Sequence, residues 1–272
     1  MAKELNGLEL QGFIKERQLR QVRNLRQEHK IIPTLLILKS PSAGPVIDTY
    51  VRMKVAYAED ILIEVEVATV AENDMQKYIQ AANIDSKIQG IIVQLPLSDK
   101  SKVDDVCNSI DSSKDVDGLG ANASYPSATA QAIDWLLAGY NVALEGKHIA
   151  IVGNGKLVGN PLGRMWKERG LLVTVLDAAS NNIAEVLRAS DVIVTATGAP
   201  RLITADQVKQ GAVVVDAGTA SESGQIVGDV DASLRERTDV TLTPTKGGVG
   251  PLTYTVLFDH LIEACLRRVG KL

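Results

Sequence analysis

Short runs of apolar residues alternate along this chain with longer segments in which apolar and polar residues recur with a helical period. Unbroken apolar runs of strand length are typical of strands that are buried on both faces, and the amphipathic segments are typical of helices that cover a sheet. The alternation therefore predicts an α/β fold with parallel sheets.

Two halves can be distinguished in this pattern. In the first half, strands are predicted at residues 33–38, 62–67 and 90–95, and helices at 13–29, 48–58 and 73–82. In the second half, strands are predicted at residues 148–152, 172–176, 192–195 and 212–215. A helix in the segment 124–140, opening after Pro126, would bridge the halves, and the last helix, 254–268, would fold back onto the first half. We therefore predict two domains, one formed by 1–120 with 252–272 and one formed by 121–251.

The charge and hydropathy of the chain narrow its class. Its formal net charge of −4 provides no general attraction to nucleic acid. No apolar run approaches the roughly 20 residues that a membrane-spanning helix requires. Charged residues recur throughout the first segment of the chain, unlike a secretion signal. These features predict a soluble, cytoplasmic protein that binds neither nucleic acid nor membrane.

The two cysteines, Cys107 and Cys265, lie far apart and have no metal-binding spacing. The three histidines, His29, His148 and His260, are scattered singly. This pattern indicates a reducing compartment and predicts neither a disulfide framework nor a metal site.

A glycine-rich loop follows the first predicted strand of the second half. Gly153, Gly155 and Gly159 lie between that strand and a helix with Pro161 in its first turn. Glycine lets a backbone turn tightly and approach a pyrophosphate, which the free N–H groups of a helix N-terminus then bind. The order of strand, loop and helix favours dinucleotide binding, whereas the alternative is a glycine turn in a domain that binds nothing.

Asp177, just beyond the next strand, is placed to bind a ribose hydroxyl, as acids in such folds do. Its charge would repel the extra phosphate of NADP, so NAD is weakly favoured, although Lys156 and Arg201 could override it. The predicted dinucleotide-binding residues are Gly153, Asn154, Gly155, Lys156, Val158, Gly159, Asp177, Thr197 and Gly198.

Tyr50 and Lys54 are four residues apart in a helical pattern and therefore share a face. A tyrosine can orient a lysine and cover it from water, and burial would lower the pKa of the lysine until it can carry protons near neutrality. Most Tyr/Lys pairs with this spacing lie on the protein surface and have no catalytic role, so the spacing alone does not show that this pair is functional.

Three further segments place polar residues or glycines where a buried core has no need of them. Gln94 ends an apolar strand, residues 114–118 form a loop with two carboxylates, and residues 247–251 are rich in glycine before the last helix. Structural explanations are an amide that caps a strand, a turn closed by its own Asx bonds, and backbone held against another chain segment.

Taken in order, these segments resemble the bifunctional methylene-tetrahydrofolate dehydrogenase/methenyl-tetrahydrofolate cyclohydrolase family. The matching segments are Tyr50-Val51 with Lys54, Val93-Gln94-Leu95-Pro96-Leu97, Lys114-Asp115-Val116-Asp117-Gly118, Val158-Gly159-Asn160-Pro161 and Gly247-Gly248-Val249-Gly250-Pro251-Leu252-Thr253. They span nearly the whole chain and are specific as an ordered set.

The resemblance implies the function and the roles of several residues. Lys54 would be the catalytic lysine, Tyr50 would lie against the folate, Gln94 would tune the lysine and Asp117 would hold the pterin ring. The implied folate-binding residues are Tyr50, Gln94, Leu95, Asp117, Gly247, Gly248 and Pro251. The resemblance also implies a homodimer in which each chain has a folate domain, a Rossmann domain and a cleft between them. The Rossmann domain would bind NADP or NAD. The protein would take part in the one-carbon metabolism that feeds purine biosynthesis.

The chain departs from the family pattern at four places. Gly153-Asn154-Gly155 stands where NADP-using members commonly have Gly-Arg-Ser, which again favours NAD. The usual Pro-Cys-Thr-Pro segment is Pro126-Ser127-Ala128-Thr129-Ala130, the proline before the double glycine is Lys246, and the serine before the tyrosine helix is replaced around Asp48-Thr49.

Two other functions remain open from the sequence. One is a dehydrogenase of the same two-domain build that acts on a shikimate-like or amino-acid substrate, although it would have no use for Gln94 and Asp117 in these contexts. The other is a non-catalytic folate or dinucleotide sensor, which would need no proton carrier such as Lys54.

Overall fold

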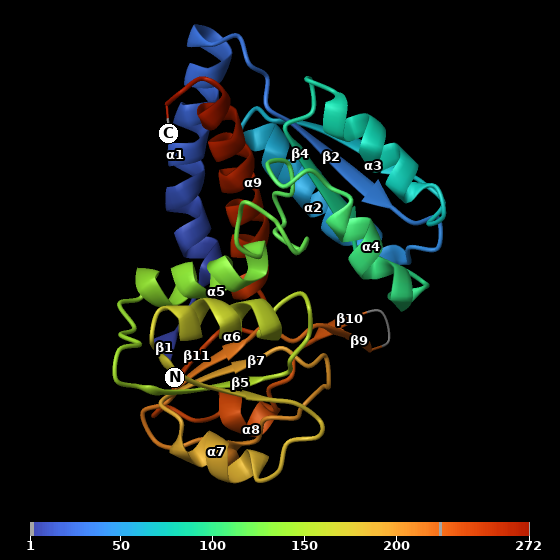
Figure 1. The fold of residues 1–272 in the computed structure, drawn as a ribbon. Coiled ribbons are helices and arrows are strands. Elements are labelled where there is room, and N and C mark those ends of the chain that lie inside the picture. The colour runs from blue at the N-terminus through green and yellow to red at the C-terminus, as the bar shows by residue number, and fades with distance from the viewer. Residues whose placement is uncertain (1–2, 223–224, 272) are drawn as a thin grey trace. The chain divides into compact units, whose positions relative to one another are not determined.

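Figure 1 shows a computed structural model of the chain, which describes residues 3–222 and 225–271. The chain forms two compact units. The six-stranded unit consists of Met1–Gln11 and Thr129–Thr253, and the three-stranded unit consists of Gly12–Ala128 and Tyr254–Leu272. Both are α/β, as the apolar runs predict.

The three-stranded unit contains a parallel sheet in the order β3-β2-β4. Its strands are β2 (Thr34–Lys39), β3 (Glu64–Thr69) and β4 (Gly90–Gln94). Its helices are α2 (Pro45–Asp60), α3 (Met75–Ile84), η1 (Lys100–Lys102), α4 (Val103–Asn108) and the greater parts of α1 (Gly7–Glu28) and α9 (Val249–Arg268). One face of this sheet packs against α3 and α4 through residues such as Leu36, Ile79 and Val106. The three predicted strands of the first half are confirmed.

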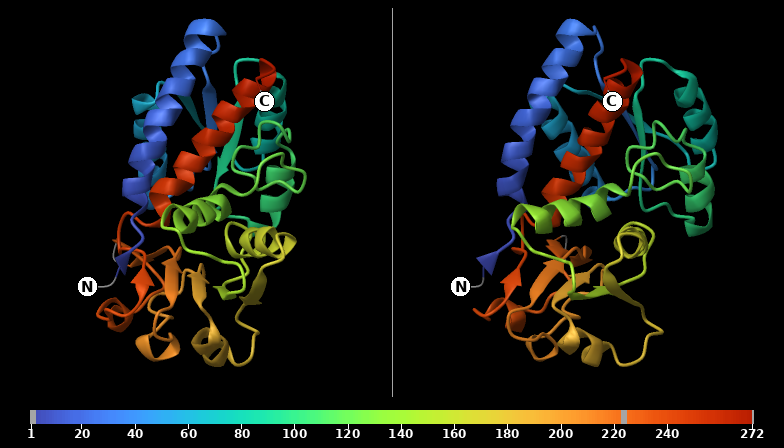
Figure 2. Two further views of the ribbon diagram at one scale, coloured as in Figure 1. Left: turned by 90° about the vertical axis from the view of Figure 1, so that its left-hand side faces the viewer. Right: turned by 60° about the vertical axis from the view of Figure 1, so that its left-hand side comes forward.

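Helices α1 and α9 run side by side within this unit, as both views of Figure 2 show. The side chain of Gln18 on α1 is buried and donates to the carbonyl of Thr255 on α9 at 2.8 Å. Arg17 forms an ion pair with Asp259 at 2.8 Å. The last helix therefore packs with the first half of the chain from Tyr254 onward, as its amphipathic pattern predicts.

The six-stranded unit contains a parallel sheet in the order β1-β11-β8-β7-β5-β6. Its strands are β1 (Lys3–Glu4), β5 (His148–Val152), β6 (Leu172–Leu176), β7 (Val192–Thr195), β8 (Val213–Asp216) and β11 (Thr241–Leu242), with a separate antiparallel pair of β9 (Ala220–Glu222) and β10 (Gln225–Val227). The helices are α5 (Ala128–Gly139), α6 (Gly159–Glu168), α7 (Ile183–Ala189), η2 (Ala205–Gln207) and α8 (Ala232–Arg235). The four strands that the second half predicts are present.

The order of strands reverses at β5, which has β6 on one side and β7 on the other. Ligands of such sheets bind beyond the carboxyl ends of the strands at this switch point. The loops that follow β5, β6 and β7 therefore lie where a dinucleotide is expected to bind.

The compact units differ from the predicted domains in three short stretches, the last being residues 252–253, which belong to the six-stranded unit. Residues 1–11 belong to the six-stranded unit, where β1 pairs with β11, and residues 121–128 belong to the three-stranded unit. In the second stretch, the N–H of Ala128 donates to the carbonyl of Asp117 at 3.0 Å, which holds the segment before α5 against the Asp117 loop.

Two helices begin five or more residues before the position that the periodicity predicts. α1 begins at Gly7 rather than at 13, because the Asn6 side chain accepts a hydrogen bond from the Glu9 N–H and caps the helix. α5 begins at Ala128, shortly after Pro126, as predicted. α9 begins at Val249, so Pro251 lies in its first turn, where proline costs no hydrogen bond, rather than before the helix.

Candidate active site and dinucleotide loop

Lys54 lies on α2, one helical turn after Tyr50. Its ammonium donates a hydrogen bond of 2.8 Å to the Oε1 atom of Gln94, the last residue of β4. The amide of Gln94 also donates to the Leu95 carbonyl at 3.3 Å, next to a cis peptide bond between Leu95 and Pro96. The structure thus brings together a helical lysine and a strand-end amide from separate sequence motifs.

Asp117 is the electrostatic partner of this lysine. Burial lowers the pKa of Lys54, and the negative charge of Asp117 opposes that shift. Burial raises the pKa of Asp117 to about 6, while the charge of Lys54 lowers it and that of Asp115 raises it further. Burial therefore shifts both groups toward their neutral forms, which makes the neutral form of the lysine more accessible than it would be in water.

Asp115, the other carboxylate of this loop, has an architectural role. It is buried and accepts hydrogen bonds from the N–H groups of Gly118 at 3.0 Å and Gly120 at 2.7 Å. Gly118 has φ +68°, and a Cβ atom there would lie 2.2 Å from the Pro126 carbonyl oxygen. The turn is therefore closed by the side chain of Asp115, as the structural explanation of this loop predicts. The carboxylate of Asp117 is not needed to close it.

His260 on α9 supports the same loop and was not predicted from the sequence. It is buried, its Nδ1 atom lies 2.8 Å from the carbonyl oxygen of Val116, and its ring stacks on Tyr125 with centroids 4.9 Å apart. Because a carbonyl only accepts, Nδ1 carries the proton. A single histidine in an apolar helix carries no signal that could have identified this contact.

A set of polar side chains at the carboxyl edge of the three-stranded sheet was also missed. The hydroxyls of Ser42 and Ser98 lie 2.7 Å apart, and Glu72 accepts from the Ser98 N–H at 2.8 Å. These residues tie together the loops that follow β2, β3 and β4, and Gln94 lies at the start of one of those loops. The signal available in the sequence was that each residue follows a predicted strand.

The glycine-rich loop of the six-stranded unit connects β5 to α6. Gly153 has φ +104°, and a Cβ atom there would lie 2.5 Å from the Ala196 carbonyl oxygen. A Cβ atom on Gly159 would lie 1.7 Å from the Gly153 carbonyl oxygen. Only glycine fits at these two positions, so the first turn of α6 is drawn close to the end of β5, as in loops that cradle a pyrophosphate.

The side chains around this loop bear on which dinucleotide it accepts. Asn160 donates to the Asn154 side chain at 3.3 Å, and the Asp177 carboxylate accepts from the Ala179 N–H at 3.0 Å. Arg201 makes two hydrogen bonds to Glu222, of 2.7 and 3.0 Å. One of the two cations that could override Asp177 is therefore already paired with a carboxylate.

The remaining predicted residues occupy two loops of the six-stranded unit. Thr197 and Gly198 follow β7, and Gly198 has φ +68°. The Gly247 carbonyl accepts from the Leu8 N–H at 3.1 Å, and a Cβ atom on Gly7 would lie 1.9 Å from the Gly248 carbonyl oxygen. The dense glycines are thus held against the start of α1, another segment of the chain.

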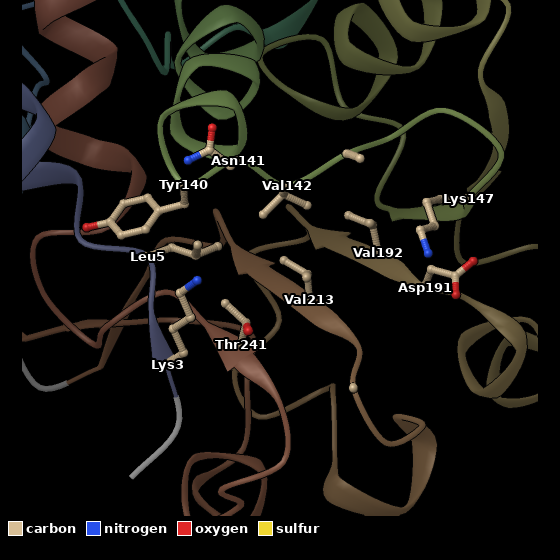
Figure 3. A pocket seen from close by; sticks show the side chains of 12 residues that line it. Lys3, Leu5, Tyr140, Asn141, Val142, Lys147, Asp191, Val192, Val213 and Thr241 are labelled. Carbon is tan, nitrogen blue, oxygen red and sulfur yellow. The ribbon is translucent and has the colours of Figure 1, made fainter.

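A cavity of about 270 Å³ lies in the six-stranded unit away from these loops, and Figure 3 shows the side chains that line it. It lies at the amino ends of the strands, where Asp191, Val213 and Thr241 line it together with Lys3 and Lys147. It is on the opposite edge of the sheet from the glycine-rich loop.

Two further properties concern the parts of the chain that the structure describes. Within 3–222 and 225–271, no three His, Cys, Asp or Glu side chains are grouped as a metal ion would require. Over the same residues, no helix has both the length and the apolar character needed to cross a membrane.

Comparison with known families gives two matches. Residues 5–117 match the family model "Tetrahydrofolate dehydrogenase/cyclohydrolase, catalytic domain". Residues 127–269 match "Tetrahydrofolate dehydrogenase/cyclohydrolase, NAD(P)-binding domain". Together the two models cover most of the chain.

Several known proteins are similar to this chain over nearly its full length. The bifunctional protein FolD of Lactobacillus acidophilus is 33% identical over 284 residues, covering 100% of both chains. The mitochondrial C-1-tetrahydrofolate synthase of Saccharomyces cerevisiae is 33% identical over 97% of this chain, which corresponds to 29% of that protein.

Among solved structures, the bifunctional FolD enzyme of Campylobacter jejuni superposes with a TM-score of 0.91 at 32% identity, covering 98% of this chain and 100% of that chain. FolD of Trypanosoma brucei, solved with NADP cofactor and an inhibitor, has a TM-score of 0.91 at 27% identity and 98% coverage of both chains.

Proposed function

Because the chain belongs to the tetrahydrofolate dehydrogenase/cyclohydrolase family, we propose that Lys54, held by Gln94 and paired in charge with Asp117, is its catalytic residue. The protein oxidises methylene-tetrahydrofolate to methenyl-tetrahydrofolate with a nicotinamide dinucleotide and hydrolyses the product to formyl-tetrahydrofolate. The single observation that carries the residue assignment is the 2.8 Å bond from a lysine of lowered pKa to Gln94.

The glycine-rich loop fits the dinucleotide, since Gly153 and Gly159 allow the backbone approach that a pyrophosphate needs. When bound, the nicotinamide supplies the hydride acceptor for the dehydrogenase reaction. In this proposal the backbone N–H groups at the start of α6 bind the pyrophosphate, and Asp177 binds a ribose hydroxyl.

In the cyclohydrolase reaction, water adds to the methenyl carbon, which is bonded to two folate nitrogens. Neutral Lys54 accepts the proton that this water loses, as a general base. The resulting ammonium returns a proton to the nitrogen that leaves as one carbon–nitrogen bond breaks, which gives the formyl product. The lowered pKa of Lys54 supports this cycle, because it allows the neutral form to be present before water attacks.

The neighbouring residues have distinct roles in this proposal. Gln94 orients the amine through its hydrogen bond, and Tyr50, on the same face of α2, lies against the folate ring. Asp117 accepts hydrogen bonds from the pterin, whose N–H groups are donors that a carboxylate can bind. Leu95, Gly247, Gly248 and Pro251 complete the proposed folate contacts.

NAD is the preferred dinucleotide in this proposal. Asp177 repels a second phosphate on the ribose, Asn154 and Gly155 replace the Arg-Ser pair of NADP-using relatives, and Arg201 is engaged by Glu222. A cytoplasmic homodimer that contributes one-carbon units for purine synthesis is also proposed, and light scattering of the purified chain tests the dimer.

The function is tested by absorbance. The purified protein should form reduced nicotinamide from methylene-tetrahydrofolate, and methenyl-tetrahydrofolate should then decay without added dinucleotide. Shikimate and amino acids serve as control substrates. Reduced nicotinamide formed only from a control substrate would identify the other dehydrogenase, and neither reaction would identify a sensor.

A further inference from the structure

A buried carboxylate lies behind the loop that follows β7 in the six-stranded unit. Asp229 is 0% exposed, and its Oδ2 atom accepts three hydrogen bonds. The donors are the Thr195 hydroxyl at 2.7 Å, the Thr197 N–H at 2.7 Å and the Thr197 hydroxyl at 2.9 Å. One oxygen atom therefore fixes both the end of β7 and the first turn of the following loop.

The loop in question, Ala196–Ala199, adjoins the glycine-rich loop. The Ala196 N–H donates to the Val152 carbonyl at 2.8 Å. The Ala196 carbonyl oxygen lies so close to Gly153 that a Cβ atom there would be 2.5 Å from it. The Thr197 hydroxyl also accepts from the Ala199 N–H at 3.0 Å, which shapes the turn around Gly198. Any shift of Thr197 would therefore be passed to the edge of the sheet where nucleotides bind.

Asp229 is itself held rigidly by a second carboxylate. Asp216, at the end of β8, accepts from the Asp229 N–H at 3.0 Å and the Val230 N–H at 3.2 Å, and Arg235 pairs with it at 3.0 Å. On the other side, a Cβ atom on Gly218 would lie 2.1 Å from Asp229 Oδ1. Within the described residues that Oδ1 atom has no hydrogen-bond partner.

Burying a carboxylate with one unpaired oxygen costs folding free energy, which suggests that Asp229 is kept for a functional reason. Because Asp229 is fully buried, it cannot touch a ligand. We propose that Asp229 is a positioning residue that sets the affinity for the dinucleotide by fixing Thr197 in the Ala196–Ala199 loop, an inference that rests on the proposed use of this edge as the dinucleotide site.

The test uses the full chain and measures dinucleotide dissociation constants directly by titration, alongside KM, kcat and cyclohydrolase activity. Asp229→Asn removes the charge but keeps the shape. It should weaken dinucleotide binding and raise KM by about tenfold, because Thr197 loses its charged acceptor. Cyclohydrolase activity, which uses no dinucleotide, should stay within about twofold. Unchanged dinucleotide affinity, or a parallel loss of both activities in a variant that keeps its melting temperature, would overturn the proposal.

A matched pair of variants keeps the test valid if Asp229→Asn does not fold. Thr197→Val and Thr195→Val each remove a hydroxyl bonded to the same carboxylate oxygen. Thr197→Val should weaken dinucleotide binding about fivefold or more, and Thr195→Val should lower stability with affinity within about twofold. Equal effects of the two would contradict a role through the loop.

A double variant separates positioning from direct contact. If Asp229 acts through Thr197, then Thr197→Val with Asp229→Asn should bind dinucleotide about as weakly as the weaker-binding of the two single variants. If the fold-losses of affinity in the two single variants multiply in the double variant, the residues act separately and the inference is overturned. Because binding is measured without folate, failure of the folate reaction in the wild type would count against the proposed function and not against this inference.

Discussion

The ammonium of Lys54 in α2 donates a 2.8 Å hydrogen bond to the amide oxygen of Gln94 at the end of β4, 40 residues further along the chain. The bond fixes the direction of the amine while leaving it able to lose a proton. Since burial already lowers the pKa of Lys54, the pair has the two properties that a proton carrier requires, a defined position and an accessible neutral form.

Lys54→Met should abolish cyclohydrolase activity, because the variant keeps the length and apolar stem of the side chain but has no amine to carry a proton. Dinucleotide binding and the melting temperature should be retained. Lys77→Met, at an exposed lysine of α3, is the control and should hydrolyse methenyl-tetrahydrofolate normally. Wild-type hydrolysis by Lys54→Met would remove this residue from the mechanism.

Asp117→Ala should weaken folate binding by about 1.5–3 kcal/mol, the contribution of hydrogen bonds to a charged acceptor. Dinucleotide binding should be nearly unchanged. Both dissociation constants can be measured by titration on the same protein. An equal loss of both ligands would show that Asp117, like Asp115, serves to hold the loop.

The cyclohydrolase rate at saturating folate should rise with pH through the pKa of Lys54, because only the neutral amine accepts a proton. Burial places this rise below 10.5, the ordinary lysine value. The charge of Asp117 raises the pKa of Lys54, so Asp117→Asn should move the rise to still lower pH. A rise that stays in place or moves to higher pH would contradict the coupling of the two groups.

NAD should be preferred over NADP, or NADP should at least lack a strong advantage. Bringing the extra phosphate toward Asp177 without a compensating arginine costs on the order of 1 kcal/mol. The measurement is kcat/KM with each dinucleotide, repeated on Asp177→Ser, which should gain activity with NADP. A wild-type preference for NADP of about tenfold would refute this prediction, and its loss in Lys156→Ala would identify the phosphate-binding cation.

Gly7→Ala should lower the free energy of unfolding by about 1–3 kcal/mol, because the new Cβ atom would collide with the Gly248 carbonyl. Gly12→Ala is the control in the same helix. Its Cβ atom would meet nothing within 4 Å, so it should raise stability by about 0.5–1 kcal/mol through helix propensity. Denaturant unfolding of both variants measures the difference, and equal changes would mean that the approach of Gly7 to Gly248 is not tight.

Local patterns were enough to predict the α/β class, seven strands and the strand–loop–helix order around Gly153. These features depend on residues close together in sequence: a short apolar run between turn residues is typical of a strand, and Gly153 and Gly159 are six residues apart. The spacing of Tyr50 and Lys54 likewise followed from the helical period alone.

Contacts between distant segments could not be predicted in this way. The two-residue strand β1 exists only because β11 lies beside it, and no local pattern distinguishes Lys3–Glu4 from a loop. The same holds for His260 behind Val116, whose role depends on where α9 packs.

The sequence alone determined which residues have the chemistry for this site, since side-chain type and local periodicity are properties of the chain itself. Only the tertiary structure decided which role each of several identical side chains has. Asp115, Asp117 and Asp229 are identical side chains, yet one closes a turn, one interacts with Lys54 and one is buried behind Thr197. Asp115 binds donors of its own turn, whereas Lys54 and Thr197 reach Asp117 and Asp229 from segments far away in the sequence, and only the packing of those segments gives the last two carboxylates different surroundings.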